Sequence, residues 1–200
     1  MFDIAQLAAL QTDAVARWHV EPITNDADAF DALVLDNHEL NFRLWHEEDR
    51  ARDPSASDSI IAQVKRQIDR LNQQRSDSIE RLDNAVADAI RSQVKHPDPS
   101  LPMNTETPGS AIDRLSILAL RIFHLSEQVQ RLEMDESSRQ RVRGSLQIAV
   151  HQRLNLSVSL QHLMDDLLAV RKRHQTFCQL KMYNDPQLNP AIYQHRELRH

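Results

Sequence analysis

Glycine is scarce in this sequence, and its scarcity excludes several kinds of nucleotide site. The 200 residues contain only two glycines, Gly109 and Gly144. A dinucleotide-binding GxGxxG turn or a phosphate-binding loop needs glycine where the backbone closely approaches a phosphate. Two isolated glycines can form neither motif. Aromatic residues are also rare, at 4% of the chain, and turn residues are few, which argues against an all-β fold.

Cysteine, long apolar runs and excess positive charge are likewise missing. The single cysteine, Cys178, cannot form an internal disulfide and indicates a reducing compartment. No run reaches the ~18 apolar residues of a membrane span, and the N-terminal stretch carries Asp3 and Asp13 instead of a signal peptide's basic start. The formal net charge of −5 argues against a nucleic-acid partner. We therefore expect a cytoplasmic protein without a membrane span.

The eight prolines divide the chain into helical stretches. Proline interrupts helix interiors, and the segments between the prolines carry apolar residues at helical spacing, as in Ile60, Val64, Ile68 and Leu71. The predicted helices span 3–20, 26–52, 57–95, 108–134 and 136–177, with a linker at 96–107 and a tail at 178–200. At about 1.5 Å per residue, the two longest would each approach ~60 Å. The sequence thus predicts one all-α domain, an elongated antiparallel bundle of about five helices that could form a homodimer.

Polar residues interrupt the apolar face of the second predicted helix, which contains the stretch "LWHEEDRARD". Steps of three or four residues from Phe30 reach Asn37, Asn41 and Glu48. These polar side chains therefore share the face that should be buried.

The third predicted helix shows a matching interruption. Arg75 stands at an apolar position, and a neighbouring row includes Lys65, Asp69, Asn72 and Asp83. A short link around Pro54 makes the second and third helices an antiparallel hairpin, which brings Glu48 opposite the turn that contains Lys65. Because buried charges persist only when paired and hydrogen-bonded, we expect a linked network of acids, amides and basic side chains.

Two interpretations of this polar seam remain open. The first is a structural salt-bridge ladder that fixes the register of the hairpin. The second is a ligand site, in which basic side chains bind a phosphate or carboxylate and acids act in catalysis or hold a divalent cation such as magnesium. The candidate catalytic acids are Glu48, Asp49, Asp69 and Asp83.

Four ordered segments resemble a known family. They are "LWHEEDRAR", "KRQIDRLNQQR", "ETPGSAIDRLSILALRIFH" and "KMYNDPQLNPAIY", and together they resemble the bacterial domain-of-unknown-function family 4254. That family has no established activity. Its members tend to be encoded among glycosyltransferase and surface-polysaccharide genes, which implies a pathway but no reaction. With these motifs, the candidate ligand-binding residues are Asn41, Arg52, Lys65, Asn72, Arg75, Asp113, Lys181, Tyr183, Asn184 and Asp185.

Two functions follow as hypotheses. The first is binding or processing of an anionic small molecule, a phosphorylated sugar or nucleotide sugar. The second is a non-catalytic adapter or scaffold that holds polysaccharide-assembly enzymes through a helix face. The adapter hypothesis predicts an exposed apolar stripe on the first or the last predicted helix. The tail, rich in aromatic and turn-forming residues, is expected to pack back on the bundle.

Overall fold

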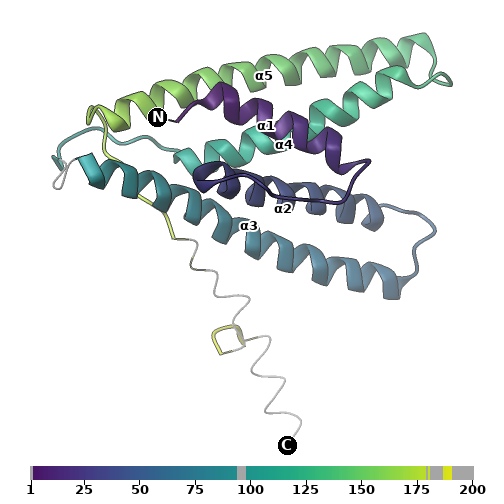
Figure 1. Ribbon diagram of the computed structural model, residues 1–200. Helices are drawn as coiled ribbons and strands as arrows, with labels where there is room; N and C mark the ends of the chain where they lie inside the picture. Colours follow the sequence, from purple (N-terminus) through teal and green to yellow (C-terminus); the bar gives the residue numbers. More distant parts are fainter. Residues whose placement is uncertain (1, 94–97, 179, 181–186, 191–200) are drawn as a thin grey trace, which may run out of the picture.

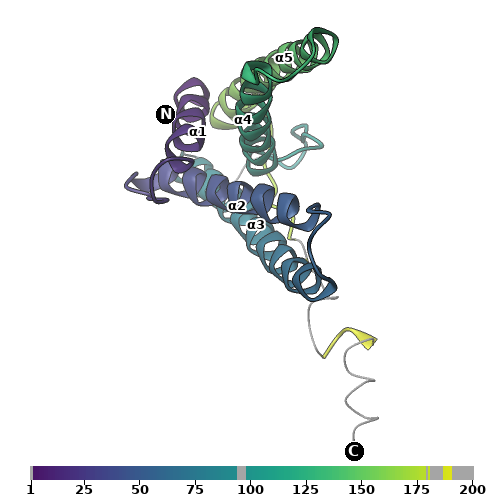
Figure 2. The same ribbon diagram turned by 90° about the vertical axis from the view of Figure 1, so that its right-hand side faces the viewer.

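The fold is all-α, as the sequence predicts. The structure, a computed structural model, describes residues 2–93, 98–178, 180 and 187–190. These residues form five helices and no strand: α1 (Ile4–Trp18), α2 (Ala29–Ala51), α3 (Asp58–Gln93), α4 (Pro108–Gln130) and α5 (Glu136–Leu168). Helices α2 and α3 make one hairpin and α4 and α5 make another, with α1 beside α4 (Figures 1 and 2).

Side-chain caps fix where three of the helices begin. Asp3 and Asp135 accept hydrogen bonds from the backbone N–H groups at the starts of α1 and α5. Thr107 does the same for α4, and Pro108 occupies the first helical turn, where its missing N–H costs nothing. The predicted start of α4 is therefore confirmed.

Helix α5 ends at Leu168, well before the predicted residue 177. Val170 adopts the left-handed conformation with φ 55°, and the N–H of Arg171 donates to the carbonyl of Asp166 at 2.8 Å. This closure ends a helix. The sequence does not predict this helix end, because the left-handed position usually carries glycine and here carries the β-branched Val170. Helix α4 also stops early, at Gln130, because Arg131 is extended.

The core lies where the two hairpins and α1 meet. Its central residues come from all five helices and include Leu7, Val34, Leu82, Ile112 and Leu163. A second cluster joins α1, α2 and α4, and a third fills the far end of the α2–α3 hairpin. Together the three clusters hold α2, α3 and α4 in place, and α2 and α3 carry most of the candidate residues.

The chain beyond α5 returns along the linker towards α3. The N–H of Arg173 donates to the carbonyl of Pro102 at 3.1 Å, and its Nε donates to the carbonyl of Leu101 at 3.2 Å. The hydroxyl of Thr176 donates to the side chain of Asn84 on α3. The linker, which the sequence suggests is structureless, is thus tied to the bundle over these residues.

Two expectations from the sequence concern the C-terminal tail and membrane spans. The candidate ligand-binding residues of the tail, Lys181, Tyr183, Asn184 and Asp185, lie outside the described residues. Among the helices of the described residues, none has the length and apolar character that crossing a bilayer requires.

Candidate functional site

A buried carboxylate on α4 links three helices. Asp113 is 3% exposed and accepts hydrogen bonds from the side-chain amides of Asn37, at 3.1 Å, and Asn41, at 2.8 Å, both on α2. From α3, Arg75 donates to it through Nε at 2.8 Å and through Nη2, which makes a two-pronged ion pair. The buried negative charge of Asp113 is therefore balanced by Arg75, and the carboxylate accepts four hydrogen bonds in all.

The network continues towards α1 through a serine. Ser116 lies one helical turn after Asp113, so its hydroxyl faces the same side of α4. It accepts a hydrogen bond from Asn41 at 3.1 Å and lies 2.7 Å from Nδ1 of His38. His38 is fully buried beside the ring of Trp18. Sequence reasoning missed His38, because a single histidine on an apolar face carries no signal of its own.

The predicted partners within the seam need correction. Asn37, Asn41 and Arg75 point inward, but the acid that Arg75 meets comes from α4. Glu48 is half-exposed and pairs with Arg52, and Lys65 pairs with Asp69 on the solvent side of α3. The reason is packing: an apolar cluster fills the interface at this end of the α2–α3 hairpin, so the charged side chains turn towards water.

Asp83, a candidate catalytic acid, anchors the start of α4. Its carboxylate is 2% exposed and accepts the N–H of Gly109 at 2.7 Å and a bond from the side chain of Thr107. Burial raises the pKa of Asp83, and these hydrogen bonds oppose the rise. A carboxylate at a helix N-terminus is stabilised by the exposed N–H groups there. Asp83 therefore has a structural position, away from the other candidate acids.

The candidate acids do not gather into a magnesium site among the described residues. Glu48 and Asp49 both contact Arg52, whereas Asp69 pairs with Lys65 and Asp83 contacts α4. The described residues hold one group of three potential metal-ligating side chains with closely spaced ligand atoms. It consists of His19, His46 and His124, which sequence reasoning missed because the three lie on different helices.

A pocket between α2, α3 and α4 does bring six of the candidate residues together. Its volume is about 410 Å³. The lining residues, with the six candidates first, are Asn41, Glu48, Asp49, Arg52, Asn72, Arg75, Leu44, Trp45, Ile117 and Leu120. The pocket thus reaches from the buried Asp113 network to the exposed acids at the end of α2.

The lining combines an apolar floor with charged walls. Leu44, Trp45, Ile117 and Leu120 supply the apolar surface. Arg52 is 67% exposed and held by Glu48 at 3.1 Å and Asp49 at 3.5 Å. Arg75 uses Nε and Nη2 on Asp113, and no described residue bonds to its Nη1. Because a guanidinium has five N–H donors, Arg75 retains donors for a ligand.

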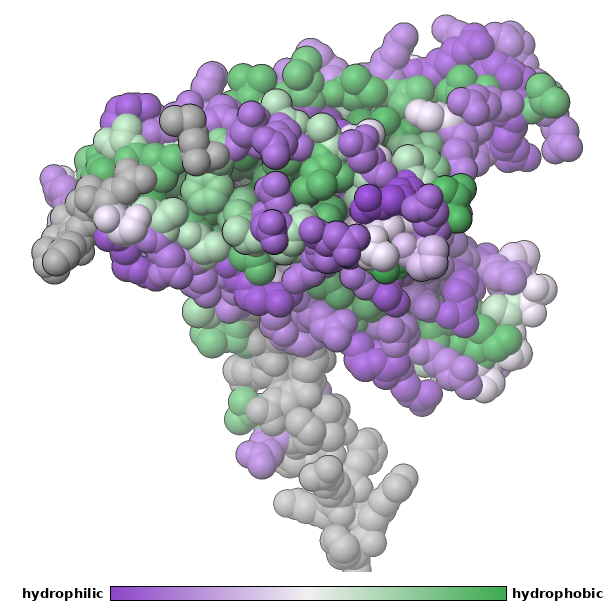
Figure 3. Space-filling view, in the orientation of Figure 1, coloured by the Kyte–Doolittle hydropathy of each residue, from purple (hydrophilic) through white to green (hydrophobic). Residues whose placement is uncertain are grey.

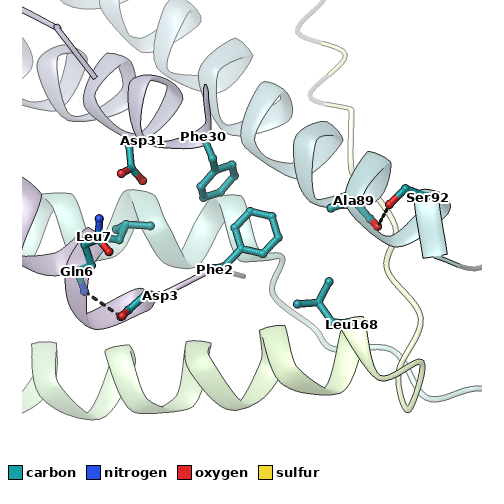
Figure 4. Close-up of a pocket in the computed structure, with 9 residues that line it drawn as sticks. All are labelled: Phe2, Asp3, Gln6, Leu7, Phe30, Asp31, Ala89, Ser92 and Leu168. Carbon is teal, nitrogen blue, oxygen red and sulfur yellow. Dashed lines mark hydrogen bonds between the residues drawn. The ribbon is translucent and has the colours of Figure 1, made fainter. Parts of the chain in front are cut away.

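A second pocket lies at the N-terminal end of α1, where α2 begins and α3 and α5 end (Figure 4). Its volume is about 360 Å³. The rings of Phe2 and Phe30 meet there edge to face, with centroids 4.6 Å apart. Among the residues that the structure describes, its charged lining residues are Asp3 and Asp31, without a basic side chain. An anionic ligand therefore fits this pocket less well than the pocket between α2, α3 and α4.

The burial of His38 makes the stability of the protein depend on pH. Burial lowers the pKa of His38 from 6.5 to about 3, with a smaller contribution from the charge of Arg153. The folded state thus binds fewer protons than the unfolded state below pH 6.5, so stability falls as the pH drops through this range towards 3. Between pH 7 and 5.5, His38 is expected to contribute a loss of about 1 kcal/mol in the free energy of unfolding.

Urea unfolding of the wild type and His38→Gln at both pH values measures this contribution. Burial also lowers the pKa of His46 and His174, so both proteins should lose stability at the lower pH. The wild type should lose about 1 kcal/mol more than the variant. Equal losses in the two proteins would show that His38 is not the buried neutral imidazole described above.

Comparison with known proteins places the chain in a family. No curated protein matches it, and no solved structure matches it. Residues 31–176 match the family described as "Protein of unknown function (DUF4254)". The match covers most of the chain, from the start of α2 to beyond α5, and includes every residue that lines the pocket between α2, α3 and α4. The chain therefore belongs to this family.

Proposed function

We propose that the protein binds a phosphorylated sugar or a nucleotide sugar in the pocket between α2, α3 and α4, and acts in surface-polysaccharide metabolism. The observation that carries the proposal is the lining itself, which joins an apolar floor containing Trp45 to arginine, amide and carboxylate side chains from α2, its C-cap and α3. The resemblance to proteins encoded among glycosyltransferase genes supports this class of ligand.

Each part of such a ligand has a matching group. Arg52 and the Nη1 donors of Arg75 suit a phosphate, because guanidinium groups form paired hydrogen bonds with phosphate oxygens. The amide of Asn72 can donate to or accept from sugar hydroxyls, and the carboxylates of Glu48 and Asp49 can accept hydrogen bonds from them. Trp45 and Ile117, which are both partly exposed, offer an apolar surface to the ring of a sugar or base. The carboxylates that hold Arg52 are half-exposed or exposed, so a phosphate can compete with them for the guanidinium.

A groove between α4 and α5 is the main competitor for an anion. Its volume is about 510 Å³, and its lining includes Arg114 and Arg121. Its other lining side chains, over the described part of the chain, are apolar, amide and hydroxyl groups, with neither an aromatic ring nor a carboxylate. The groove suits a simple anion better than a sugar, and Arg121→Ala distinguishes it from the proposed pocket.

Calorimetric titration with UDP-glucose and with glucose 1-phosphate tests the proposal. Arg52→Ala should weaken binding about 10–100-fold, since a hydrogen bond to a charged group contributes roughly 1.5–3 kcal/mol. Arg50→Ala is the matched control: its side chain is on the same helix, is 60% exposed and pairs with Glu47. It should bind as the wild type does.

The outcomes separate the sites. Loss of affinity in Arg121→Ala but not in Arg52→Ala would show that the ligand binds in the α4–α5 groove. No heat and no rise in the thermal midpoint at millimolar ligand would refute the proposal, because binding to the native state must stabilise it.

A second candidate function, a helical adapter for polysaccharide-assembly enzymes, is favoured by the surface of α5. Four apolar side chains of this helix are exposed, namely Ile148, Val150, Leu154 and Val158, at 61%, 48%, 61% and 47%. Apolar side chains show among the polar ones along α5 in Figure 3. Val150, Leu154 and Val158 are spaced four residues apart and form the kind of stripe that the adapter hypothesis expects, whereas Ile148 lies on a different side of α5. Exposed apolar stripes are typical of interaction surfaces.

Leu154→Glu tests the adapter function. An assembly enzyme recovered with the wild-type protein should be lost with this variant, since a charge in an apolar interface is desolvated without a partner. Light scattering on the same two proteins detects a homodimer. A dimer that Leu154→Glu converts to a monomer would assign the stripe to a second copy of the chain instead of an enzyme.

A further inference from the structure

Three histidines from three helices meet at one end of the bundle. His19 is the C-cap residue of α1, His46 lies on α2 and His124 lies on α4. One ring nitrogen of each lies within 4.8 Å of the others. We propose that these histidines bind a transition-metal ion, Zn²⁺, at a site separate from the sugar pocket. The proposal does not rest on the proposed function.

Hydrogen bonds fix the ring nitrogens that would face the ion. Nδ1 of His19 lies 2.6 Å from the carbonyl oxygen of Val15, and Nδ1 of His124 lies 2.9 Å from a carboxylate oxygen of Glu127. A carbonyl or carboxylate oxygen can only accept, so each Nδ1 carries the proton and each Nε2 presents a lone pair. A carboxylate that orients a histidine in this way is the usual outer partner of a zinc ligand.

Both of these lone pairs lack a hydrogen-bond donor among the described residues. The Nε2 atoms of His19 and His124 are buried and have no hydrogen-bond partner among the described residues. Leaving a buried acceptor unsatisfied is costly, and such atoms are rare in folded proteins. A shared metal ion would satisfy both at once, and aromatic packing alone does not explain why two histidines direct bare nitrogens into the same space.

Aromatic neighbours hold the rings close to the geometry required. His19 stacks on Phe123 with centroids 4.2 Å apart, and His124 stacks on Trp45 at 4.7 Å. His46 meets Phe42 edge to face at 4.5 Å. Two nitrogen ligands of a tetrahedral zinc ion lie about 3.3 Å apart. The ligand atoms of the three histidines lie within 4.8 Å of one another, so small side-chain rotations would bring them to that separation.

The chemistry of the ligands selects the metal. Three imidazoles suit zinc and related transition metals, whereas magnesium prefers oxygen ligands. The imidazoles must be neutral to bind a metal ion. The carboxylates of Asp49 and Glu127 interact electrostatically with His46, and their negative charge would offset part of the charge of the ion. Three protein ligands leave a fourth position open for water or a small molecule.

Metal titration of the whole chain, first stripped with a chelator, tests the site. Zn²⁺ should bind with a stoichiometry of one and raise the thermal midpoint. Co²⁺ in its place should give the intense visible absorption of a four- or five-coordinate nitrogen site. His46→Gln should abolish the absorption, whereas His162→Gln, which changes an exposed histidine of α5, should leave it intact.

A variant at the surface keeps the test independent of folding. Glu127 is half-exposed and bonds only to His124 among the described residues. Glu127→Gln should weaken zinc affinity about 10–100-fold, the typical cost of losing an outer partner. Glu133→Gln, at another exposed acid, should have no effect. Binding that is equally strong in His46→Gln and the wild type, or no stoichiometric binding at all, would overturn the proposal.

Discussion

Replacing Asp113 with alanine is expected to lower the free energy of unfolding by about 3–5 kcal/mol. The carboxylate is the shared acceptor for Asn37, Asn41 and Arg75. Its removal leaves the Arg75 guanidinium, which is 28% exposed in the ion pair, without a counter-charge. It also leaves the buried amide of Asn37 without its acceptor and the amide of Asn41 with only Ser116 and Asn37 as acceptors. Breaking a buried pair by removing one partner is among the most destabilising single changes.

Urea unfolding of the wild type and four variants, namely Asp113→Ala, Arg75→Ala, the double variant and Asp69→Ala, measures this loss of stability and its origin. Asp69→Ala is the matched control, because it removes an aspartate from an exposed pair with Lys65 and should cost no more than about 1 kcal/mol. The double variant Asp113→Ala/Arg75→Ala should cost less than the sum of the two single variants, since each single change strands the other partner. Strict additivity would show that the two side chains do not form the pair described.

The second large effect is expected for Gly109→Ala, which should destabilise the protein by about 1–3 kcal/mol. A Cβ at this position would lie 2.6 Å from the carbonyl oxygen of Ile79 and 2.9 Å from the carboxylate of Asp83. The carbonyl belongs to the backbone of α3 and cannot yield without disturbing that helix. Movement of α4 to relieve the contact would weaken the bond from the Gly109 N–H to Asp83.

The opposite effect, a gain in stability, is expected for Gly144→Ala. A Cβ at Gly144 meets no atom within 4 Å, and the residue lies inside α5, where alanine is favoured over glycine by up to about 1 kcal/mol. Thermal unfolding should therefore show a lower midpoint for Gly109→Ala and a higher midpoint for Gly144→Ala. A midpoint for Gly109→Ala at or above the wild-type value would contradict the close approach of α4 to α3.

The sequence predicts the helices better than it predicts their ends. The number of helices follows from proline positions and apolar spacing, and the start of α4 follows from Thr107 and Pro108. The end of α5 does not follow, because Val170 takes a conformation that its residue type disfavours. A local pattern reports what each residue prefers, and it cannot report where packing overrides that preference.

The candidate site, like the fold, is only partly predictable from the sequence. The inward direction of Asn37, Asn41 and Arg75 is readable from helical spacing on α2 and α3. Their common partner, Asp113, is not readable from spacing, since α4 is distant in sequence. Nor does any pattern place Trp45 on the floor of the pocket, or against His124 of the histidine cluster.

By itself, the amino-acid sequence determined an all-α chain, because scarce glycine, spaced prolines and 3.6-residue apolar periodicity are local properties. Only the tertiary structure decided which polar side chains meet. A helix fixes the face on which a residue lies, but the partner on that face is set by how whole helices pack. Arg75 therefore pairs across to α4, Glu48 turns to solvent, and three unrelated histidines share one space.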